Sequence, residues 1–293
     1  MSKWDKDYLA LCSRILTEGT EVVNRTGVNS IKVPSHHFHF DLEQEFPILT
    51  TKQLFIRQAV LEMLWIYQAP SIDVRWRQER DVKIWDQWEI DENGYWNATQ
   101  LLPDENGNLV KQQVHKFFGK EFAHTIGTAY GYIVKKFHMT QELIDKIQHH
   151  PEDRRMVMTL WQNDYLDTAV LPSCVWSSEW DVTNGKLNCW VHQRSCDVPL
   201  GLPFNVTQYA VLLCMLAHVS GLKPGTIDWS IKDAHIYVNQ ADGIREQLRR
   251  FKENGDLPAP ELWLNPQVKD FFAFDNSRDI KDIKLVNYQH MGK

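Results

Sequence analysis

The sequence lacks a paired-cysteine motif and an excess of basic charge. Its five cysteines are an odd number and include no Cys-x-x-Cys pair, which argues against a disulfide framework and against a thiolate zinc site. The net charge of −6 gives no support for general nucleic-acid binding. An anionic substrate would therefore need a local group of arginines, because the overall field of the protein does not attract it.

Long apolar segments are also lacking. The longest run, from Tyr209 to Val219, is too short to span a bilayer and is interrupted by His218. The first residues, Met1 to Asp7, contain no apolar secretory segment. We therefore expect a soluble, cytoplasmic protein without a membrane partner. A hydrophobic fraction of 43% and 12 tryptophans predict a sizeable core, and one α/β-type domain is the simplest interpretation of 293 residues.

The strongest local signal is a β-hairpin that follows Cys174. Runs of β-forming residues lie on both sides of Asn184-Gly185, and this pair favours a two-residue turn because both positions need a positive φ. Pairing outward from that turn places Cys174 opposite Ser195 and next to Arg194, although one β-bulge would shift the register. A thiol beside a guanidinium and a hydroxyl suits a nucleophile with an anion-binding neighbour.

Two predicted helices carry polar residues in apolar surroundings. Residues 54–67 are apolar on nearly all sides, which predicts a buried helix around Glu62. A buried carboxylate has a raised pKa, as a general acid or base requires; alternatively, Glu62 reaches solvent or pairs with an arginine. Residues 206–218 predict a second buried helix. Asn205, at its edge, is either an N-cap or an amide that reads the edge of a base.

Three further patterns each allow a structural or a functional interpretation. Trp85 and Trp88 are either core residues or walls for a flat aromatic ligand. Arg154-Arg155 is either a solvated pair or two guanidinium groups that bind one phosphate. Residues 91–124 are polar and contain several turn signals, which predicts a surface insertion or small subdomain.

Two predicted strands carry histidines. Three histidines at positions 36, 37 and 39 could suggest a metal, but no acidic or cysteine ligand lies at a convincing spacing, which favours a half-exposed strand over residues 31–42. In the second strand, alternation places Asp233, His235 and Tyr237 on one face.

Together these stretches resemble the thymidylate synthase family over almost the whole chain, from Asn24-Arg25-Thr26-Gly27 to Asn287-Tyr288. The resemblance implies an α+β (α/β-type) fold, with one domain over residues 1–293 and a small inserted subdomain at about 91–124. It further implies a large mixed, twisted β-sheet flanked by helices, and a sheet-to-sheet homodimer. The most specific motifs are Leu171-Pro172-Ser173-Cys174, Gln193-Arg194-Ser195 through Pro203-Phe204-Asn205, and Asp233-Ala234-His235-Ile236-Tyr237.

The resemblance also implies a reaction, the reductive methylation of 2′-deoxyuridine 5′-phosphate (dUMP) to dTMP. The carbon and the hydride come from 5,10-methylenetetrahydrofolate, which leaves as dihydrofolate, and no metal or nucleic acid is needed. Cys174 is then the nucleophile that adds to C6 of the pyrimidine, and Glu62 moves protons through ordered water.

The remaining roles follow from the same resemblance. The phosphate is bound by Arg25, Arg194 and Ser195, and by Arg154 and Arg155 from the second subunit. Asn205 holds the uracil edge, His235 and Tyr237 hold the sugar hydroxyl, and Tyr130 lies in the polar network near the nucleophile. The folate site comprises Ile84, Trp85, Trp88, Leu171, Asp197, Leu200, Gly201 and Phe204, with Lys52 facing the glutamate tail. Asp197 and Arg194 also count among the catalytic residues.

The sequence departs from the family pattern in two places. Val175 stands where many members have histidine, which is outside the core chemistry. The sequence stops at His290-Met291-Gly292-Lys293, where the family has a short apolar tail that covers bound folate. The tail is therefore either trimmed or absent, and absence would impair closure of the site.

An open site would favour water over hydride, as in the related pyrimidine hydroxymethylases. A deoxyuridylate hydroxymethylase is accordingly the alternative function. Trp85 and Trp88 favour methyl transfer, and Asn205 favours uracil, since the cytosine-specific relatives carry aspartate there. A catalytically inactive nucleotide-binding dimer is a third possibility, which the joint presence of Cys174, Glu62 and Asn205 disfavours.

Overall fold

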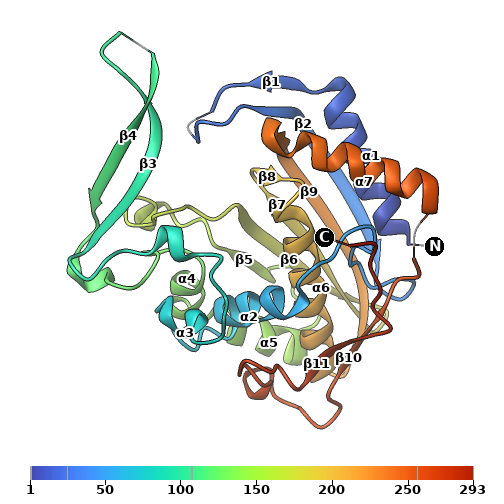
Figure 1. The fold of residues 1–293 in the computed structure, drawn as a ribbon. Helices are drawn as coiled ribbons and strands as arrows, with labels where there is room; N and C mark the ends of the chain where they lie inside the picture. Colours follow the sequence, from blue (N-terminus) through green and yellow to red (C-terminus); the bar gives the residue numbers. More distant parts are fainter. Residues whose placement is uncertain (1, 25, 107, 256, 293) are drawn as a thin grey trace.

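The computed structural model describes residues 2–24, 26–106, 108–255 and 257–292, and over these residues its centre is a mixed seven-stranded β-sheet (Figure 1). β7 and β8 run parallel to β9, and the other pairs are antiparallel. The predicted large mixed sheet is thus confirmed. In order across the sheet, the strands are β1 (Thr20–Val22), β2 (Ser30–Asp41), β9 (Lys223–Tyr237), β7 (Lys186–Gln193), β6 (Val175–Thr183) and β5 (Val157–Thr159), and β8 (Cys196–Asp197) also pairs with β9.

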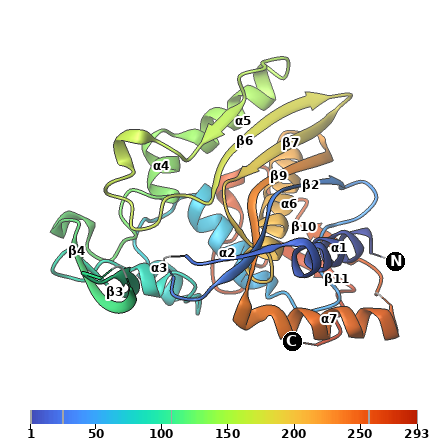
Figure 2. The ribbon, with the colours of Figure 1, turned by 90° about the horizontal axis from the view of Figure 1, so that it is seen from above.

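Helices flank this sheet (Figure 2). Over its centre they form two layers, one against the strands and a second packed on the first. α1 (Lys3–Glu18) packs on β2 and β9, α6 (Gly201–Val219) packs on β7 and β9, and α2 (Ile56–Tyr67) packs on α6. The other helices are α3 (Arg75–Gln78), α4 (Gly131–Lys136), α5 (Met139–His149) and α7 (Ala241–Asn254), with the 3-10 turns η1 (Asp86–Trp88), η2 (Lys120–Phe122), η3 (Asn163–Tyr165), η4 (Val238–Gln240) and η5 (Phe271–Ala273).

The two faces of the sheet differ in burial. Along β9, every second side chain between residues 227 and 231 is buried toward the helices, because side chains alternate between faces. The side chains at positions 228, 230 and 232 are more exposed and form an outer face. The buried set is Ile227, Trp229 and Ile231, at most 3% exposed, and the outer set is Asp228, Ser230 and Lys232.

α6 is the core helix of the protein. By length and composition it could cross a membrane, but 72% of its most apolar window is buried inside the protein. It begins at Gly201, ahead of the predicted start at residue 206, so Pro203 lies in its first turn. Proline is tolerated there because the first N–H groups of a helix have no partner within the helix. Asn205 is therefore inside the helix and is not its N-cap.

Two small sheets lie apart from the central one. β3 (Tyr95–Pro103) and β4 (Leu109–Phe117) form a hairpin that projects from the body of the protein (Figures 1 and 2). The hairpin lies within the predicted insertion and packs at its base on a small cluster of Ile90, Trp96 and Phe118. β10 (Glu261–Leu264) and β11 (Ile283–Val286) form the other sheet.

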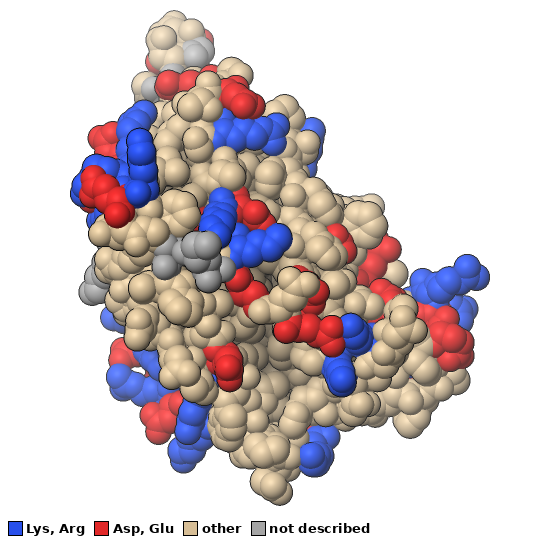
Figure 3. All heavy atoms as spheres, turned by 90° about the vertical axis from the view of Figure 1, so that its right-hand side faces the viewer, with Lys and Arg blue, Asp and Glu red and all other residues tan. Residues whose placement is uncertain are grey.

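Acidic and basic side chains are interspersed on the face of the molecule shown in Figure 3. Opposite charges also pair along α7, where Arg249 contacts Glu246 and Glu253, and Arg250 contacts Glu246. Mixed charge of this kind agrees with the modest net charge of the sequence, and such exposed pairs contribute little to stability.

Candidate active site

The predicted hairpin after Cys174 is present, with one change of register. Asn184 and Gly185 form the turn, with φ of 53° and 73°. The pairing shifts between Val175 and Ser177, where Trp176 is the extra residue of a β-bulge. The expected partner Ser195 is therefore wrong by one residue. The backbone N–H of Arg194 donates to the Cys174 carbonyl at 2.9 Å, so the bulge brings the arginine directly beside the thiol.

Arg194 is fixed against the Cys174 loop by its own hydrogen bonds. Its Nε donates to the Ser173 carbonyl at 3.0 Å, and its Nη2 donates to the Pro172 carbonyl at 2.7 Å. The same Nη2 lies 3.7 Å from the Cys174 Sγ. A guanidinium held at this place puts a positive charge next to the sulfur. Cys174 is partly exposed, whereas Cys12 is buried, and burial raises the pKa of the Cys12 thiol to about 12.

Tyr130 lies on the other side of Cys174. Its hydroxyl oxygen accepts a hydrogen bond from the backbone N–H of Cys174 at 2.9 Å, and its ring lies edge-on to Trp85, with centroids 5.1 Å apart. Burial, followed by the nearby Cys174 group, raises the pKa of Tyr130 well above its usual value. Tyr130 therefore stays protonated and neutral at physiological pH.

Glu62 is a buried carboxylate with two neutral donors. Trp85 Nε1 donates to Oε1 at 2.6 Å, and Gln208 Nε2 donates to Oε2 at 2.8 Å. The residue is 7% exposed, and burial raises its pKa, opposed by the hydrogen bonds from Trp85 and Gln208 and by the charge of Arg77. A carboxyl of raised pKa, held in place but not paired in a salt bridge, can take up and release a proton.

Asn205 is oriented by two glutamines. Its Oδ1 accepts from Gln193 Nε2 at 3.1 Å, and its Nδ2 donates to Gln208 Oε1 at 3.3 Å. Gln193 is fixed in turn by Trp229, whose Nε1 donates to Gln193 Oε1 at 3.0 Å. Sequence reasoning did not single out either glutamine as a site residue. The available signals were a polar residue within the apolar run of α6 for Gln208, and the position before Arg194 for Gln193.

A single cavity brings these groups together. It lies between α2, α6 and the start of β6, and Cys174, Glu62, Asn205, Tyr130 and Trp85 all line it. These residues come from segments far apart in the chain, and the fold alone makes them neighbours. A thiol beside a guanidinium, in one cavity with a buried carboxylate and a fixed amide, is chemical equipment typical of an enzyme.

The end of β9 is linked to the loop after β7 by hydrogen bonds. Asp197 Oδ1 accepts from the Leu200 N–H at 3.0 Å, and its Oδ2 accepts from Gln240 Nε2 at 3.0 Å. The Tyr237 N–H donates to Gln240 Oε1 at 3.0 Å. His235 is mostly buried, with its ring edge-on to Tyr237 at 5.1 Å.

The side chains predicted to bind folate include several exposed apolar groups. Ile84 is 39% exposed and Leu200 is 60% exposed, and Trp85 and Trp88 lie with ring centroids 5.3 Å apart. Gly201 opens α6, and Leu171 and Phe204 are partly buried. Apolar and aromatic walls of this kind suit a flat, aromatic ligand.

Lys52 lies at one end of this region. Its Nζ donates to the Pro199 carbonyl at 2.6 Å, and burial lowers its pKa. The preceding residues, Thr50 and Thr51, are anchored by the buried carboxylate of Asp5, which accepts hydrogen bonds from their N–H and hydroxyl groups at 2.6 to 3.1 Å. The loop that carries Lys52 is thus tied to α1.

Among the predicted substrate residues that the structure describes, Asn205 lines the cavity that contains Cys174. The others lie outside its lining, namely Arg154, Arg155, Arg194, Ser195, His235 and Tyr237. Arg154 and Arg155 are exposed and line a separate surface hollow with Lys146 and His150. Arg155 pairs with Asp153, its Nε lying 2.8 Å from Oδ1. Arg25 lies outside the described residues. Ser195 follows Arg194 and is partly exposed.

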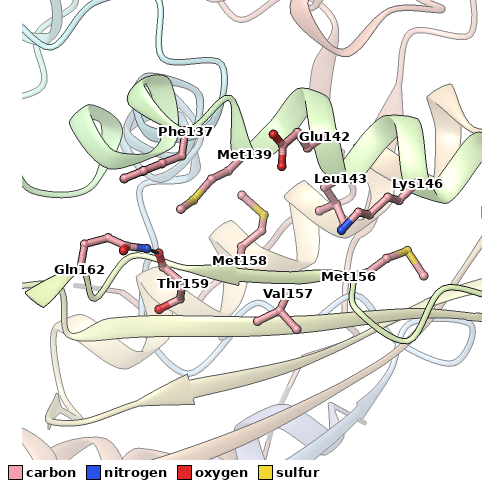
Figure 4. A pocket seen from close by; sticks show the side chains of 10 residues that line it. All are labelled: Phe137, Met139, Glu142, Leu143, Lys146, Met156, Val157, Met158, Thr159 and Gln162. Atoms are coloured by element: carbon pink, nitrogen blue, oxygen red, sulfur yellow. Dashed lines mark hydrogen bonds between the residues drawn. The ribbon is translucent and has the colours of Figure 1, made fainter.

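A second cavity, of about 320 Å³, lies between α5 and β5 (Figure 4). Its walls are mixed, with the apolar side chains of Met139, Met156 and Met158 beside the polar side chains of Glu142 and Lys146. It contains neither a thiol nor a buried carboxylate. The described residues also hold no group of three or more His, Cys, Asp or Glu arranged for a metal ion. His37 and His39 instead lie exposed on β2, each 3.0 Å from Asp228 Oδ1, which confirms the half-exposed strand.

Comparison with known proteins assigns the family. Residues 6–293 match the family model of thymidylate synthase. The chain is 44% identical over 290 residues to the thymidylate synthase of Clostridium beijerinckii, which covers 99% of this chain and 96% of that protein. Its structure is similar to that of the thermostable thymidylate synthase A from Bacillus subtilis, with a TM-score of 0.80, 34% identity, and coverage of 99% and 97% of the two chains.

The chain belongs to the thymidylate synthase family. It is a methyltransferase that converts dUMP to dTMP, with 5,10-methylenetetrahydrofolate as the cosubstrate and without a metal ion. The family model and the relative thus confirm the predicted reaction and favour it over the hydroxymethylase alternative.

Proposed function

We propose that Cys174 is the nucleophile of this methylation and that Arg194 activates it. The observation that carries this proposal is the 3.7 Å approach of Arg194 Nη2 to the Cys174 Sγ. A free thiol of pKa about 8.5 is only a few per cent thiolate at neutral pH, and a nearby cation raises that fraction. The sulfur adds to C6 of the pyrimidine, which makes C5 nucleophilic and places negative charge on O4.

The oriented amide of Asn205 stabilises this charge and recognises uracil. Gln193 and Gln208 hold it in one orientation, and a preorganised donor is worth most where charge develops in the transition state. His235 and Tyr237 bind the sugar hydroxyl. Arg194 and Ser195 bind the phosphate together with Arg25.

Glu62 handles the proton that must leave C5. Its carboxylate faces the same cavity as Cys174 and takes up the proton through ordered water. Tyr130 keeps the Cys174 backbone in place, and Asp197 holds the loop that opens α6. Once the methyl group is complete, the sulfur leaves C6 and the thiolate is restored.

The folate site extends from Trp85 and Trp88 toward Lys52. The folate supplies both the carbon and the hydride when it is bound. Its flat ring system packs against Ile84, Trp85, Trp88, Leu171, Leu200, Gly201 and Phe204. Lys52 faces its anionic tail.

The protein acts as a homodimer through the outer face of the central sheet. Trp176 and Trp190 are 36% and 48% exposed there, and large aromatic side chains gathered on an exposed face typically mark an interface. In such a dimer Arg154 and Arg155 extend to the phosphate in the second subunit, which explains why they lie away from the cavity of their own chain. Residues 1–293 form one catalytic domain with an insertion at about 91–124, and the location of the enzyme is cytoplasmic.

Cys174→Ser tests the nucleophile. The variant is expected to lose turnover by several orders of magnitude, because a serine hydroxyl is not ionised at neutral pH, while dUMP still binds. A 5-fluorinated dUMP with the folate should form a covalent adduct with the unchanged protein and none with the variant. Cys214→Ser, on α6, is the matched control and should behave like the unchanged enzyme. Normal turnover by Cys174→Ser would refute the assignment.

A further inference from the structure

Arg77 is a fully buried arginine with no hydrogen-bond partner. It lies on α3 and is 0% exposed, and none of its three side-chain nitrogens has a partner among the described residues. Removing a charge from water without pairing it costs several kcal/mol. Burial accordingly lowers the pKa of Arg77 to about 10, which still leaves the guanidinium charged at neutral pH. A group this unfavourable for folding calls for an explanation.

The surroundings of Arg77 point to Glu62. The guanidinium carbon lies over the ring of Trp65, 4.4 Å from its centroid. Trp65 lies on α2 three residues after Glu62, on adjacent turns of the same helix face. Glu62 is also the acidic group whose charge acts most strongly on Arg77. The two side chains make no salt bridge within 4.0 Å.

The other acids near Arg77 are engaged elsewhere. Asp86 and Glu89 accept hydrogen bonds from Gln78 at 3.2 and 2.9 Å, and Glu89 also contacts His124 at 2.9 Å. The Glu89 side chain keeps 22% of its surface exposed, so solvent screens its charge. Glu62 is the buried negative charge that remains.

We propose that Arg77 is a positioning residue that keeps the Glu62 carboxylate ionised for the proton transfers of the methylation reaction. The inference rests on the role proposed for Glu62. A direct salt bridge would hold the carboxylate too firmly in its ionised form. A charge at a distance offsets part of the cost of burying the carboxylate and leaves both oxygens able to accept a proton.

The remaining groups around Glu62 do not supply this charge. Trp85, which directly precedes η1, and Gln208 on α6 are neutral donors. Tyr130, at the start of α4, stays neutral because burial raises its pKa. Cys174, across the cavity, adds negative charge when it is a thiolate. Among the described residues, Arg77 is the cation whose charge lowers the pKa of Glu62 and so offsets part of the effect of burial.

Arg77→Leu tests the inference through the pH dependence of kcat. Without the cation the pKa of Glu62 rises further, so a smaller fraction is ionised at a given pH. We expect the acid limb of the kcat profile to move up by about one pH unit, which is about a tenfold loss on that limb, and to recover at high pH. Arg77→Lys should largely restore the profile, and KM for dUMP should stay unchanged.

Stability and a neighbouring arginine provide the controls. An apolar side chain in place of an unpaired buried charge is expected to leave thermal stability unchanged or raised, so a loss of activity without a loss of stability separates the two effects. Arg80→Leu is the matched variant, because Arg80 also lies over a tryptophan, 3.8 Å from the ring centroid of Trp76. The acidic groups that interact with its charge are Glu79 and Asp275, and not Glu62. This variant should leave the profile in place.

Glu62→Gln distinguishes the failure of this inference from the failure of the proposed function. If Glu62→Gln keeps full kcat, Glu62 is not the proton carrier and both statements are wrong. If it loses kcat while Arg77→Leu keeps the original acid limb, or loses activity equally at every pH, the role of Arg77 alone is wrong. In the Glu62→Gln background, Arg77→Leu should cause no further shift of the profile.

Discussion

At the scale of single residues, the site depends on a few polar groups whose orientation is fixed by others. Arg194 is held by two carbonyls, Glu62 by two neutral donors and Asn205 by two glutamines. Each of the three lies in a buried or part-buried network of hydrogen bonds. Breaking one of these bonds without replacing it costs about 1 to 3 kcal/mol, so each side chain keeps its orientation. Such preorganisation is what the reaction needs.

Asn205→Asp tests the reading of the base. A carboxylate accepts but does not donate, so it suits the amino group of cytosine better than the carbonyl of uracil. We expect preference to shift toward the cytosine nucleotide, by about tenfold or more in a competition assay, since one mismatched hydrogen bond is worth about 1 to 3 kcal/mol. Unchanged selectivity would contradict the base-reading role.

Glu62→Gln also makes a prediction about stability. The pKa of Glu62 in the folded protein is raised above its ordinary value, so the native state binds a proton more tightly than the unfolded state does. Stability therefore falls as pH rises from the unfolded to the folded pKa, and the loss persists above it. Glutamine does not titrate, so the stability difference between variant and unchanged protein should move in the variant's favour from acidic to alkaline pH. Urea denaturation at several pH values measures this, and a constant difference would contradict it.

Some of these residues could be predicted from sequence and others could not. Cys174, Arg194 and Asn205 lie in motifs that also carry recognisable local structure, a hairpin and a buried helix. Arg77 lies in a short polar run with no periodic pattern, so nothing in the sequence indicates that it is buried. Its burial follows from where α3 packs, which is set by distant segments.

At the scale of elements, one extra residue in β6 determines which side chain lies beside Cys174. The turn at Asn184-Gly185 sets the register of β6 and β7. Because of the bulge at Trp176, the residue opposite Cys174 is Arg194 and not Ser195. The turn was predictable because its φ requirement is local. The bulge was not, because it depends on packing on both faces of the strand. The early start of α6 was missed for a related reason, since Pro203 marks either a loop or a first helical turn.

Gly185→Ala tests the turn. Gly185 has φ of +73° and no atom within 4 Å of an added Cβ, so the cost is backbone strain alone. We expect a loss of about 1 kcal/mol in the free energy of unfolding. Gly243→Ala on α7 is the matched control, since its added Cβ also meets nothing within 4 Å, and it should stabilise by about 0.5 to 1 kcal/mol. Equal effects from the two substitutions would count against a strained turn.

At the scale of the whole molecule, the two faces of the central sheet differ: one packs on helices and the other is exposed. The inner face packs on α6, which carries Asn205, and α6 in turn packs on α2, which carries Glu62. The outer face presents aromatic and polar side chains, which we propose bind a second subunit. Two faces with different burial were predictable from alternation along β9. The proposal that a second subunit covers the outer face comes only from the family, because alternation shows exposure and not a partner.

Trp190→Asp tests the proposed dimer. Trp190 is 48% exposed on β7, and a carboxylate there would be desolvated on association. We expect a shift from dimer to monomer in analytical ultracentrifugation, together with loss of activity, because Arg154 and Arg155 would no longer reach a neighbouring site. Trp263→Asp on β10, where the tryptophan is 39% exposed, should leave the mass unchanged. A fully dimeric Trp190→Asp protein would argue against this face.

The hairpin of β3 and β4 has a consequence for local motion. Among the residues that the structure describes, its own buried cluster consists of Ile90, Trp96 and Phe118, whereas the strands of the central sheet share the main core. Segments with few buried contacts open at a small fraction of the global unfolding free energy. Amide protons of β3 and β4 should therefore exchange with solvent deuterium well before those of β7 and β9, and the hairpin can be lengthened or exchanged in the course of evolution without disturbing the chemistry beside it.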